Sequence, residues 1–333
     1  MIVEASPWED SASLLAYGGE NQLTILRRTS SLGSSARDGG IIESLRFSHV
    51  SNFSLSGRVH SLAWSPNSSS DEQTSRVSLS AACSDHTLQC LSATEYSSHR
   101  TSLLGHTDYV NSIAYCSSSR NGSSSSSHGV HLASTGDDHT VHLWNVEQEA
   151  AVQVFSLNSP GMSVKFNSQE PNLLMAAESA GDVNVFDLRG HSLVAFSLHS
   201  EHSSLLDADW STADATLFGC VVNRRWTIWD CRSTANASDT ASTHVNTLAS
   251  QIPIAIEGPV APTTLSKFRW SHTHPTLFAT LGAPSTVTIW DSTNPQAPIS
   301  ESSASTRVGS ITWLQNRACL LSGSYRSISF ILL

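Results

Sequence analysis

The hydrophobic residues of this chain lie in short segments separated by Gly, Asp and Ser, and these segments recur in groups of three. The first member of a group ends on an aromatic residue, as in Val59–Trp64, Val110–Tyr115, Met162–Phe166, Leu206–Trp210, Leu265–Trp270 and Val308–Trp313. Such segments are too short for helices and show no 3.6-residue period, so the pattern predicts β-strands. Their nearly continuous apolar character is typical of strands that are buried on both faces.

The second and third members of each group follow the first at regular distances. The second series is Leu14–Tyr17, Leu79–Cys83, Leu132–Thr135, Leu173–Ala177, Leu217–Val222, Leu277–Leu281 and Leu320–Gly323. The third series is Gln22–Leu26, Thr87–Leu91, Thr140–Trp144, Asp182–Phe186, Trp226–Trp229, Thr286–Trp290 and Ser327–Phe330. Before Leu14, only the segment Ile2–Ala5 can serve as a first strand, so the pattern predicts seven groups in all.

The fullest group runs from Gly105 to Val146. It starts with Gly-His before a strand, turns at Asp137-Asp-His-Thr140 and ends its third strand on Trp144-Asn145, an order that is the signature of one WD40 propeller blade. Because such a blade takes about 40–45 residues, the length predicts an all-β fold, a single seven-bladed WD40 β-propeller over residues 1–333. The expected blades are roughly residues 1–50, 51–104, 105–157, 158–199, 200–250, 251–303 and 304–333.

Serine-rich segments separate several of the strands and are predicted to be surface loops. They are Thr29–Ser44, Pro66–Arg76, Ser117–Gly129 and Arg232–Thr263. The last contains the apolar stretch Ile252–Pro259, for which packing on the rim is favoured over a role as a docking segment. Neither end of the chain has a strand to spare for closing the ring, so we expect the last blade to be three-stranded or completed by a partner.

One constellation suggests chemistry at first sight. His106, Ser134 and Asp138 supply the residue types of a hydrolase triad, and Trp144 is their neighbour. In a WD40 blade these four positions form a buried hydrogen-bond relay from Trp to Ser to His to Asp. The serine lies within a central strand and not at the strained turn that exposes a nucleophile. A structural tetrad is therefore favoured over a catalytic site, and no catalytic residue is predicted.

Composition and charge exclude several other classes of function. The formal net charge is -10 and the 18 Lys and Arg residues are scattered, which disfavours direct binding to nucleic acid. The six cysteines form no CxxC pair and the histidines show no ligand spacing, so neither a metal, nor a cofactor, nor a small-molecule substrate is expected. No apolar run reaches the ~20 residues that cross a bilayer, so no membrane insertion is expected, and the chain opens without the pattern of a signal peptide.

A short motif keeps a second function open. Trp229-Asp-Cys-Arg232, with a weaker copy at Phe186–Arg189, resembles the WDxR box of substrate receptors of cullin-4 ubiquitin ligases. The aspartate that this box carries several residues earlier is missing, since residues 223–225 stand there. We therefore favour the interpretation of Arg232 as an arginine solvated beyond a strand end.

Further segments resemble one family beyond the generic repeat. They are Leu15–Gly19, Gly105–Asn111, Asp137–Thr140, Leu157–Val164, Leu173–Glu178, Phe268–Ser271 and Leu277–Gly282. Together they are similar to the nucleoporin thirty-seven family, the small single-propeller subunit of the Y-shaped complex in the outer ring of the nuclear pore. The crossover Ser159-Pro-Gly-Met162 carries most of the specificity, because the WD40 template does not require it.

The resemblance implies a non-enzymatic scaffold nucleoporin at the nuclear envelope, with a kinetochore role in mitosis for some members. Its propeller would dock on the helical part of the largest Y-complex subunit beside other outer-ring nucleoporins, and would support pore assembly and the transport of protein and mRNA. Blade-top loops supply the candidate partner-binding residues, which are Asn158, Met162, Asn223, Arg224 and Arg225. The alternative function is that of a WD40 substrate receptor of a cullin-4 ubiquitin ligase.

Overall fold

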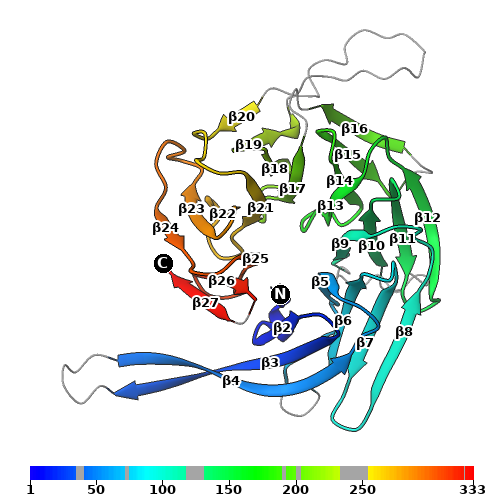
Figure 1. Ribbon diagram of the computed structural model, residues 1–333, viewed down its shortest axis with the longest axis vertical. Coiled ribbons are helices and arrows are strands. Elements are labelled where there is room, and N and C mark those ends of the chain that lie inside the picture. Colours follow the sequence, from blue (N-terminus) through cyan, green and yellow to red (C-terminus); the bar gives the residue numbers. More distant parts are fainter. Residues whose placement is uncertain are drawn as a thin grey trace.

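The strands of this chain form seven antiparallel sheets that stand like blades around a central axis (Figure 1). The computed structural model describes residues 1–34, 41–71, 75–117, 131–189, 193–199, 204–232, 254–325 and 327–333. Within each sheet the strands follow one another in chain order, so every blade is a meander. The expected all-β, seven-bladed propeller is confirmed.

The first four blades contain four strands each. Blade one comprises β1 (Ile2–Ala5), β2 (Leu14–Gly18), β3 (Gln22–Ser34) and β4 (Ile41–Ser54), and blade two comprises β5 (Val59–Trp64), β6 (Val77–Cys83), β7 (Leu88–Ala93) and β8 (Ser98–Leu103). Blade three comprises β9 (Val110–Tyr115), β10 (His131–Gly136), β11 (Thr140–Asn145) and β12 (Ala150–Ser156), and blade four comprises β13 (Gly161–Phe166), β14 (Leu173–Glu178), β15 (Asp182–Asp187) and β16 (Leu193–His199).

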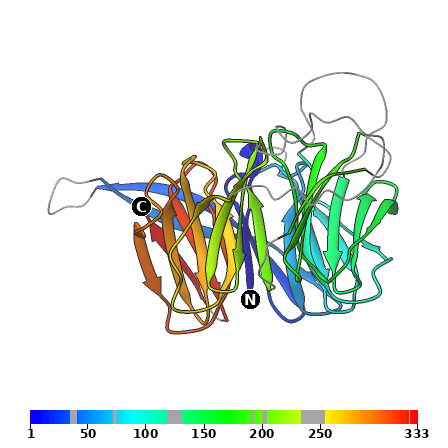
Figure 2. The ribbon, with the colours of Figure 1, turned by 90° about the horizontal axis from the view of Figure 1, so that it is seen from above.

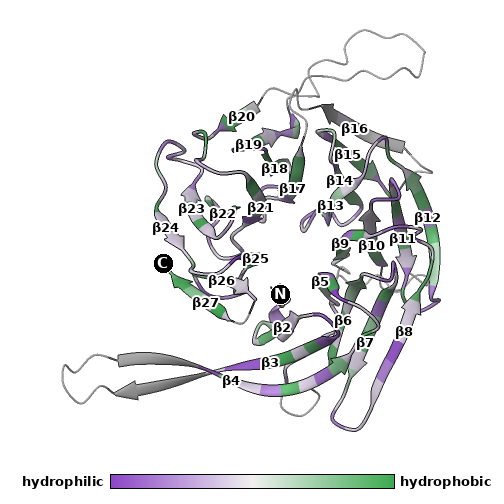
Figure 3. Ribbon diagram, in the orientation of Figure 1, coloured by the Kyte–Doolittle hydropathy of each residue, from purple (hydrophilic) through white to green (hydrophobic). Residues whose placement is uncertain are grey.

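The last three blades differ in their number of strands. Blade five comprises β17 (Leu205–Trp210), β18 (Leu217–Val222), β19 (Arg225–Asp230) and β20 (Ile254–Glu257), and blade six comprises β21 (Leu265–Trp270), β22 (Leu277–Gly282), β23 (Thr286–Asp291) and β24 (Ser300–Ser303). Blade seven has three strands in the described ranges, β25 (Val308–Trp313), β26 (Cys319–Ser324) and β27 (Ile328–Leu332). The outermost of these, β27, is rich in hydrophobic residues (Figure 3).

The N-terminal strand belongs to blade one and not to the last blade. It pairs with β2 in the register Ile2↔Gly18 to Ala5↔Leu15, which makes it the innermost strand of its sheet. The structure thus agrees with both expectations for this region: the segment Ile2–Ala5 supplies the first inner strand, and in the described ranges no terminal strand closes the last blade.

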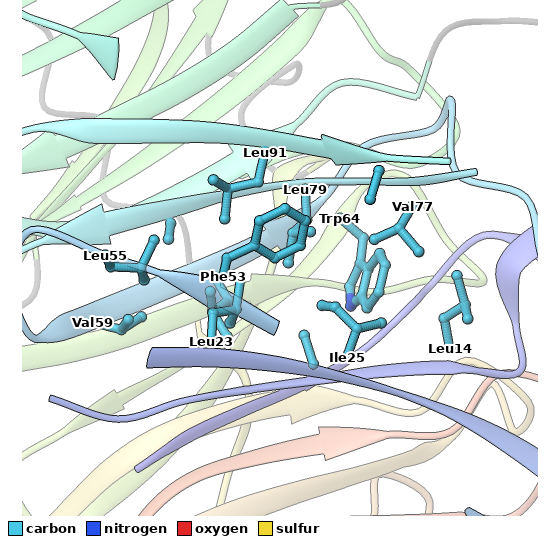
Figure 4. Packing of buried hydrophobic residues seen from close by; sticks show 14 of the residues in the cluster. Leu14, Leu23, Ile25, Phe53, Leu55, Val59, Trp64, Val77, Leu79 and Leu91 are labelled. Atoms are coloured by element: carbon cyan, nitrogen blue, oxygen red, sulfur yellow. The ribbon is translucent and has the colours of Figure 1, made fainter. Parts of the chain in front are cut away.

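The hydrophobic core is divided among the interfaces between neighbouring blades. Between blades one and two, Leu23, Ile25 and Phe53 of the first sheet lie in one cluster with Trp64 and Leu79 of the second (Figure 4). None of these side chains is more than 8% exposed. Because a sheet is covered by a neighbour on each side, its strands carry apolar residues on both faces, which explains the nearly continuous apolar runs of the sequence.

In three blades, a tryptophan at the end of the inner strand ties its blade to the preceding one. The indole Nε1 of Trp64 donates to the carbonyl oxygen of Glu4 at 3.0 Å. In the same way, the indole Nε1 of Trp313 donates to the carbonyl oxygen of Arg269 at 3.0 Å. A large side chain with a single donor fits this place, since it fills the interface and satisfies a carbonyl of the preceding sheet.

The two faces of the ring carry different connections (Figure 2). On the face where the inner strands begin lie the crossovers between blades and the turns between second and third strands; we call it the crossover face, and the opposite one the cavity face. A chain of backbone hydrogen bonds joins neighbouring connections of the crossover face: Ser179 N–H donates to Pro160, Ser204 N–H to Ser179, Asn223 N–H to Ser204 and Leu265 N–H to Asn223, at 2.7–3.2 Å.

The predicted loop at Thr29–Ser44 is wrong over most of its length. The strand β3 continues to Ser34 and β4 starts at Ile41, and their pairing extends to Ser34↔Ile41. Cross-strand backbone pairing does not depend on side-chain polarity, so a serine-rich composition does not prevent it. The resulting hairpin, here called the β3–β4 arm, extends beyond the ring of blades (Figures 1 and 2).

The predicted loop Arg232–Thr263 also contains a strand. β20 (Ile254–Glu257) pairs with β19, and Ile256 packs against the cluster that holds Trp226, as the packing interpretation of this stretch requires. Parts of three predicted loops lie outside the described residues: residues 233–253 of Arg232–Thr263, residues 118–129 of Ser117–Gly129 and residues 72–74 of Pro66–Arg76. Across the ranges described, no helix is long and apolar enough to cross a membrane.

Candidate functional site

The four residues of the predicted tetrad meet at the crossover-face end of blade three. His106, in the crossover before β9, lies with its Nε2 2.7 Å from the Ser134 Oγ of β10 and its Nδ1 2.7 Å from Asp138 Oδ2. The indole Nε1 of Trp144 on β11 donates to the same Ser134 Oγ at 2.8 Å. Each polar group in this relay therefore has a partner.

Burial and hydrogen bonding together determine the protonation states of His106 and Asp138. The side chains of His106 and Asp138 are 1% and 5% exposed. Burial lowers the pKa of His106 more than the charge of Asp138 raises it, which favours the neutral imidazole. Burial would raise the pKa of Asp138, but hydrogen bonds from Thr140 and the contact with His106 hold it below its ordinary value. A neutral histidine can donate from Nδ1 to the carboxylate and accept from the serine hydroxyl at Nε2.

The environment of Ser134 does not suit a nucleophile. Its side chain is 0% exposed within the central strand β10, so a substrate has no access to the hydroxyl. The hydroxyl also accepts from Trp144 Nε1 while it contacts His106. The arrangement can brace loops against the sheet, and that role remains our prediction for these four residues.

A second histidine brings a possible ligand set close to the relay. One imidazole nitrogen or carboxylate oxygen from each of His106, Asp138 and His142 lies within 4.8 Å of the other two. Both ring nitrogens of His106 are already engaged by Ser134 and Asp138, so a cation bound there would have to break the relay. Burial lowers the pKa of His142 to about 4, and its ring packs on Trp144 with centroids 5.1 Å apart. The geometry favours packing over metal binding.

Replacing Asp138 with Ala should lower the free energy of unfolding by about 2 kcal/mol, because the buried His106 loses its acceptor. Asp85 in blade two is the matched control: it accepts from Thr87 as Asp138 accepts from Thr140, but it lies on the surface without a histidine partner. Urea unfolding should show a clearly smaller loss of unfolding free energy for Asp85→Ala than for Asp138→Ala. Equal shifts for the two variants would contradict a stabilising relay.

The crossover Asn158–Met162 is held from within by Glu178, which the sequence did not single out. Glu178 Oε2 accepts from the backbone N–H of Asn158 at 2.9 Å and of Ser159 at 2.7 Å, while Oε1 accepts from the Asn184 side chain at 2.6 Å. Burial raises the pKa of Glu178, which is 0% exposed. The crossover is therefore a fixed loop, with Asn158 exposed and Met162 half-buried.

The turn that holds the other three candidate residues is also fixed. Asn223 has a positive φ of 54°, the left-handed conformation that Asn adopts at low cost. Arg224 Nε donates to the carbonyl oxygen of Ala261 at 2.7 Å, and Arg225 forms an ion pair with Glu257. All three residues are exposed. They lie on the crossover face, as Asn158 and Met162 do. They belong to the β18–β19 turn of blade five, whereas Asn158 and Met162 belong to the crossover from blade three to blade four.

The arginines of the two WDxR-like segments fold back onto their own motif. Arg232 Nε lies 3.0 Å from both carboxylate oxygens of Asp230, and Arg189 makes the same fork with Asp187. Both arginine side chains are 62% exposed. This geometry agrees with the favoured interpretation, an arginine solvated beyond a strand end.

The structure also contains an ionic cluster near the axis that was not predicted from the sequence. Arg269 of β21 pairs with Asp207 of β17, and the charges of Glu4, Asp209 and Lys267, all on inner strands, act on this pair. Burial raises the pKa of Asp207, but the charges of Arg269 and Lys267 outweigh it and hold this pKa below its ordinary value. The signal in the sequence is a charged residue inside an otherwise apolar inner strand. Beside the cluster, a cavity of about 210 Å³ opens toward the cavity face.

No family model matches this chain, but several known proteins are similar to it. Nucleoporin Nup37 of Mus musculus is 28% identical over 286 residues, which cover 85% of this chain and 78% of the relative. Nup37 of Homo sapiens shows the same identity and coverage. Nup37 of Drosophila melanogaster is 28% identical over 188 residues, 56% of this chain and 55% of the relative.

Proposed function

Because this chain is a homologue of the Nup37 nucleoporins and folds as a seven-bladed WD40 propeller, we propose that it is a scaffold nucleoporin of the nuclear pore complex that catalyses no reaction. The similarity over 85% of the chain carries this proposal. The burial of Ser134 supports the non-enzymatic part, since the triad-like set of His106, Ser134 and Asp138 is closed to substrate.

We further propose that the propeller docks on the helical part of the largest Y-complex subunit in the outer ring, and thereby supports pore assembly and nucleocytoplasmic transport. A ring of sheets tied blade to blade presents a preorganised surface, so little conformational entropy is lost on docking. The kinetochore association of some members is part of the same proposal.

The crossover face is the surface that we propose for this contact. Its loops are held by the carboxylate of Glu178 and by the hydrogen-bond chain from Pro160 to Leu265. Asn158 and Arg224 stand exposed on this fixed frame. Residues on rigid loops can anchor a partner without first being ordered.

Two exposed arginines on opposite faces allow a decisive test. Arg224 lies on the crossover face, while Arg232 lies beyond the end of β19 on the cavity face and belongs to the WDxR-like segment. The tagged full chain should recover Y-complex nucleoporins from its own cells, and Arg224→Glu should reduce that recovery at least fivefold whereas Arg232→Glu should not. Recovery of the cullin-4 adaptor without nucleoporins, lost in Arg232→Glu, would instead establish the ligase receptor.

A further inference from the structure

Blade seven leaves uncovered a position that every other blade buries. Phe330 on β27 pairs with Leu321 in the register in which Ile289 of blade six pairs with Ala279. The residues at this position in blades one to six are Ile25, Cys90, Leu143, Val185, Ile228 and Ile289, and they are 0–8% exposed. Phe330 is 39% exposed.

The difference arises from the fourth strand. In the six other blades an outer strand pairs directly with this position, for example Ser300 with Ile289 and Ile256 with Ile228. In the described residues, β27 pairs with β26 and its outer edge carries no further strand. Six blades of the same chain therefore show what fits this edge: an antiparallel strand.

The surface beside this edge is apolar. Leu332 is 71% exposed on the same strand, and β27 is among the most hydrophobic outer strands of the ring (Figure 3). From the β3–β4 arm, Phe47 stacks on Phe330 with ring centroids 5.4 Å apart. Phe47 and Ile328 both pack against the cluster around Leu321. The ring of Phe47 thus gives the base of the arm an apolar surface, here called the apolar wall, next to the open edge.

Basic side chains surround one end of this edge. Phe47 pairs with Arg28 across the arm, and Arg46 is exposed beside it. Arg317 lies two residues before Cys319, whose backbone N–H donates to the Arg317 carbonyl oxygen at 2.8 Å. Burial raises the pKa of the Cys319 thiol, and the charges of Arg28 and Arg317 act against that rise. Cys319 pairs with Leu332, which places this positive charge at the end of β27. A strand running antiparallel to β27 would begin there.

We propose that the outer edge of β27 accepts an extended segment of a partner protein as the fourth strand of blade seven. The segment is acidic where it begins, opposite Leu332, and apolar on the side that faces blade one. Leu103 and Phe155 are the buried residues with which the fourth strands of blades two and three meet their own neighbours. Strand addition supplies the backbone hydrogen bonds, and the apolar wall selects the side chains.

This inference goes beyond the proposed function, because it does not depend on which assembly holds the propeller. An exposed apolar edge strand is an aggregation hazard that proteins normally cover. An extended partner segment that is acidic where it begins would cover it and bring carboxylates beside the arginine side chains, whereas a second copy of this chain would bring a second basic edge against the first.

A photo-crosslinking amino acid at Leu332 of the full chain, expressed in its own cells, tests the inference. We expect crosslinks to a short partner segment with alternating apolar residues and acidic residues at its start. That segment, as a synthetic peptide, should slow amide hydrogen exchange of residues 328–332 in the purified chain at least fivefold. Phe330→Ser should weaken the protection at least fivefold. Tyr325→Ser, which removes another exposed aromatic of blade seven, should leave it unchanged.

Several outcomes would overturn the inference. These are crosslinks to another part of this chain, to a second copy or to a segment of helical periodicity, and a cross-linked peptide that leaves the exchange of β27 unaltered. Absence of a crosslink, with fast exchange of β27 in the purified native assembly, would overturn it as well. The proposed function would be unaffected by these results, since recovery of Y-complex nucleoporins is measured separately.

Discussion

Replacing Asp207 with Ala is expected to lower the free energy of unfolding by about 3 kcal/mol, because it leaves a buried guanidinium without its closest counter-ion. The Asp207 side chain is 2% exposed and that of its partner Arg269 is 17% exposed. Asp207 Oδ2 also accepts the backbone N–H of Phe268 at 3.1 Å. The substitution therefore removes a charge and a hydrogen-bond acceptor together. The carboxylates of Glu4 and Asp209 lie near Arg269 and keep the loss from being larger.

Urea unfolding of the full chain provides the measurement, with Asp230→Ala as the matched control. Asp230 is also paired with an arginine, but that arginine, Arg232, is 62% exposed, and exposed ion pairs contribute little. The free energy of unfolding of Asp207→Asn should lie between those of the wild type and Asp207→Ala, because the Asn carbonyl oxygen can still accept from the Phe268 N–H. A shift for Asp207→Ala no larger than for Asp230→Ala would contradict the role of this pair.

The repeat itself was readable from the sequence. The ring interfaces bury both sheet faces, so the strands carry apolar residues, and the inner strands of blades two to seven end on an aromatic residue that fills the interface. These features recur in successive blades, so they leave a periodic signal. The same counting of segments predicted a last blade that is three-stranded or completed by a partner, and the described residues place three strands there.

Other features leave no periodic signal. The length of the β3–β4 arm depends on backbone pairing between residues such as Ser34 and Ile41, and composition does not report pairing. Glu178 reads as an ordinary charged residue at a strand end, yet its burial against the Asn158 and Ser159 amides fixes the crossover. The pair of Asp207 and Arg269 joins blades five and six, so neither residue identifies its partner along the chain.

Gly161→Ala is expected to lower the free energy of unfolding by about 3 kcal/mol through overpacking. A Cβ at Gly161 would lie 1.8 Å from Thr135 Oγ1 and 2.9 Å from Thr135 Cβ. Thr135 cannot move aside at low cost, because its side chain is 0% exposed and its hydroxyl donates to the carbonyl of Thr140 at 2.9 Å. The Gly161 carbonyl also accepts from Asn111 Nδ2 at 3.0 Å, which holds the crossover against blade three.

The specific contact with Thr135 can be isolated by a double-mutant cycle. Thr135→Ala removes the oxygen that a new Cβ would meet first, so Gly161→Ala should cost less in that background than in the wild type. Gly19→Ala is the control for the glycine substitution itself, since its Cβ would meet nothing closer than the Gln22 carbonyl at 4.0 Å. Additive losses in the cycle would mean that backbone conformation, and not the close approach of blades three and four, requires glycine in this crossover.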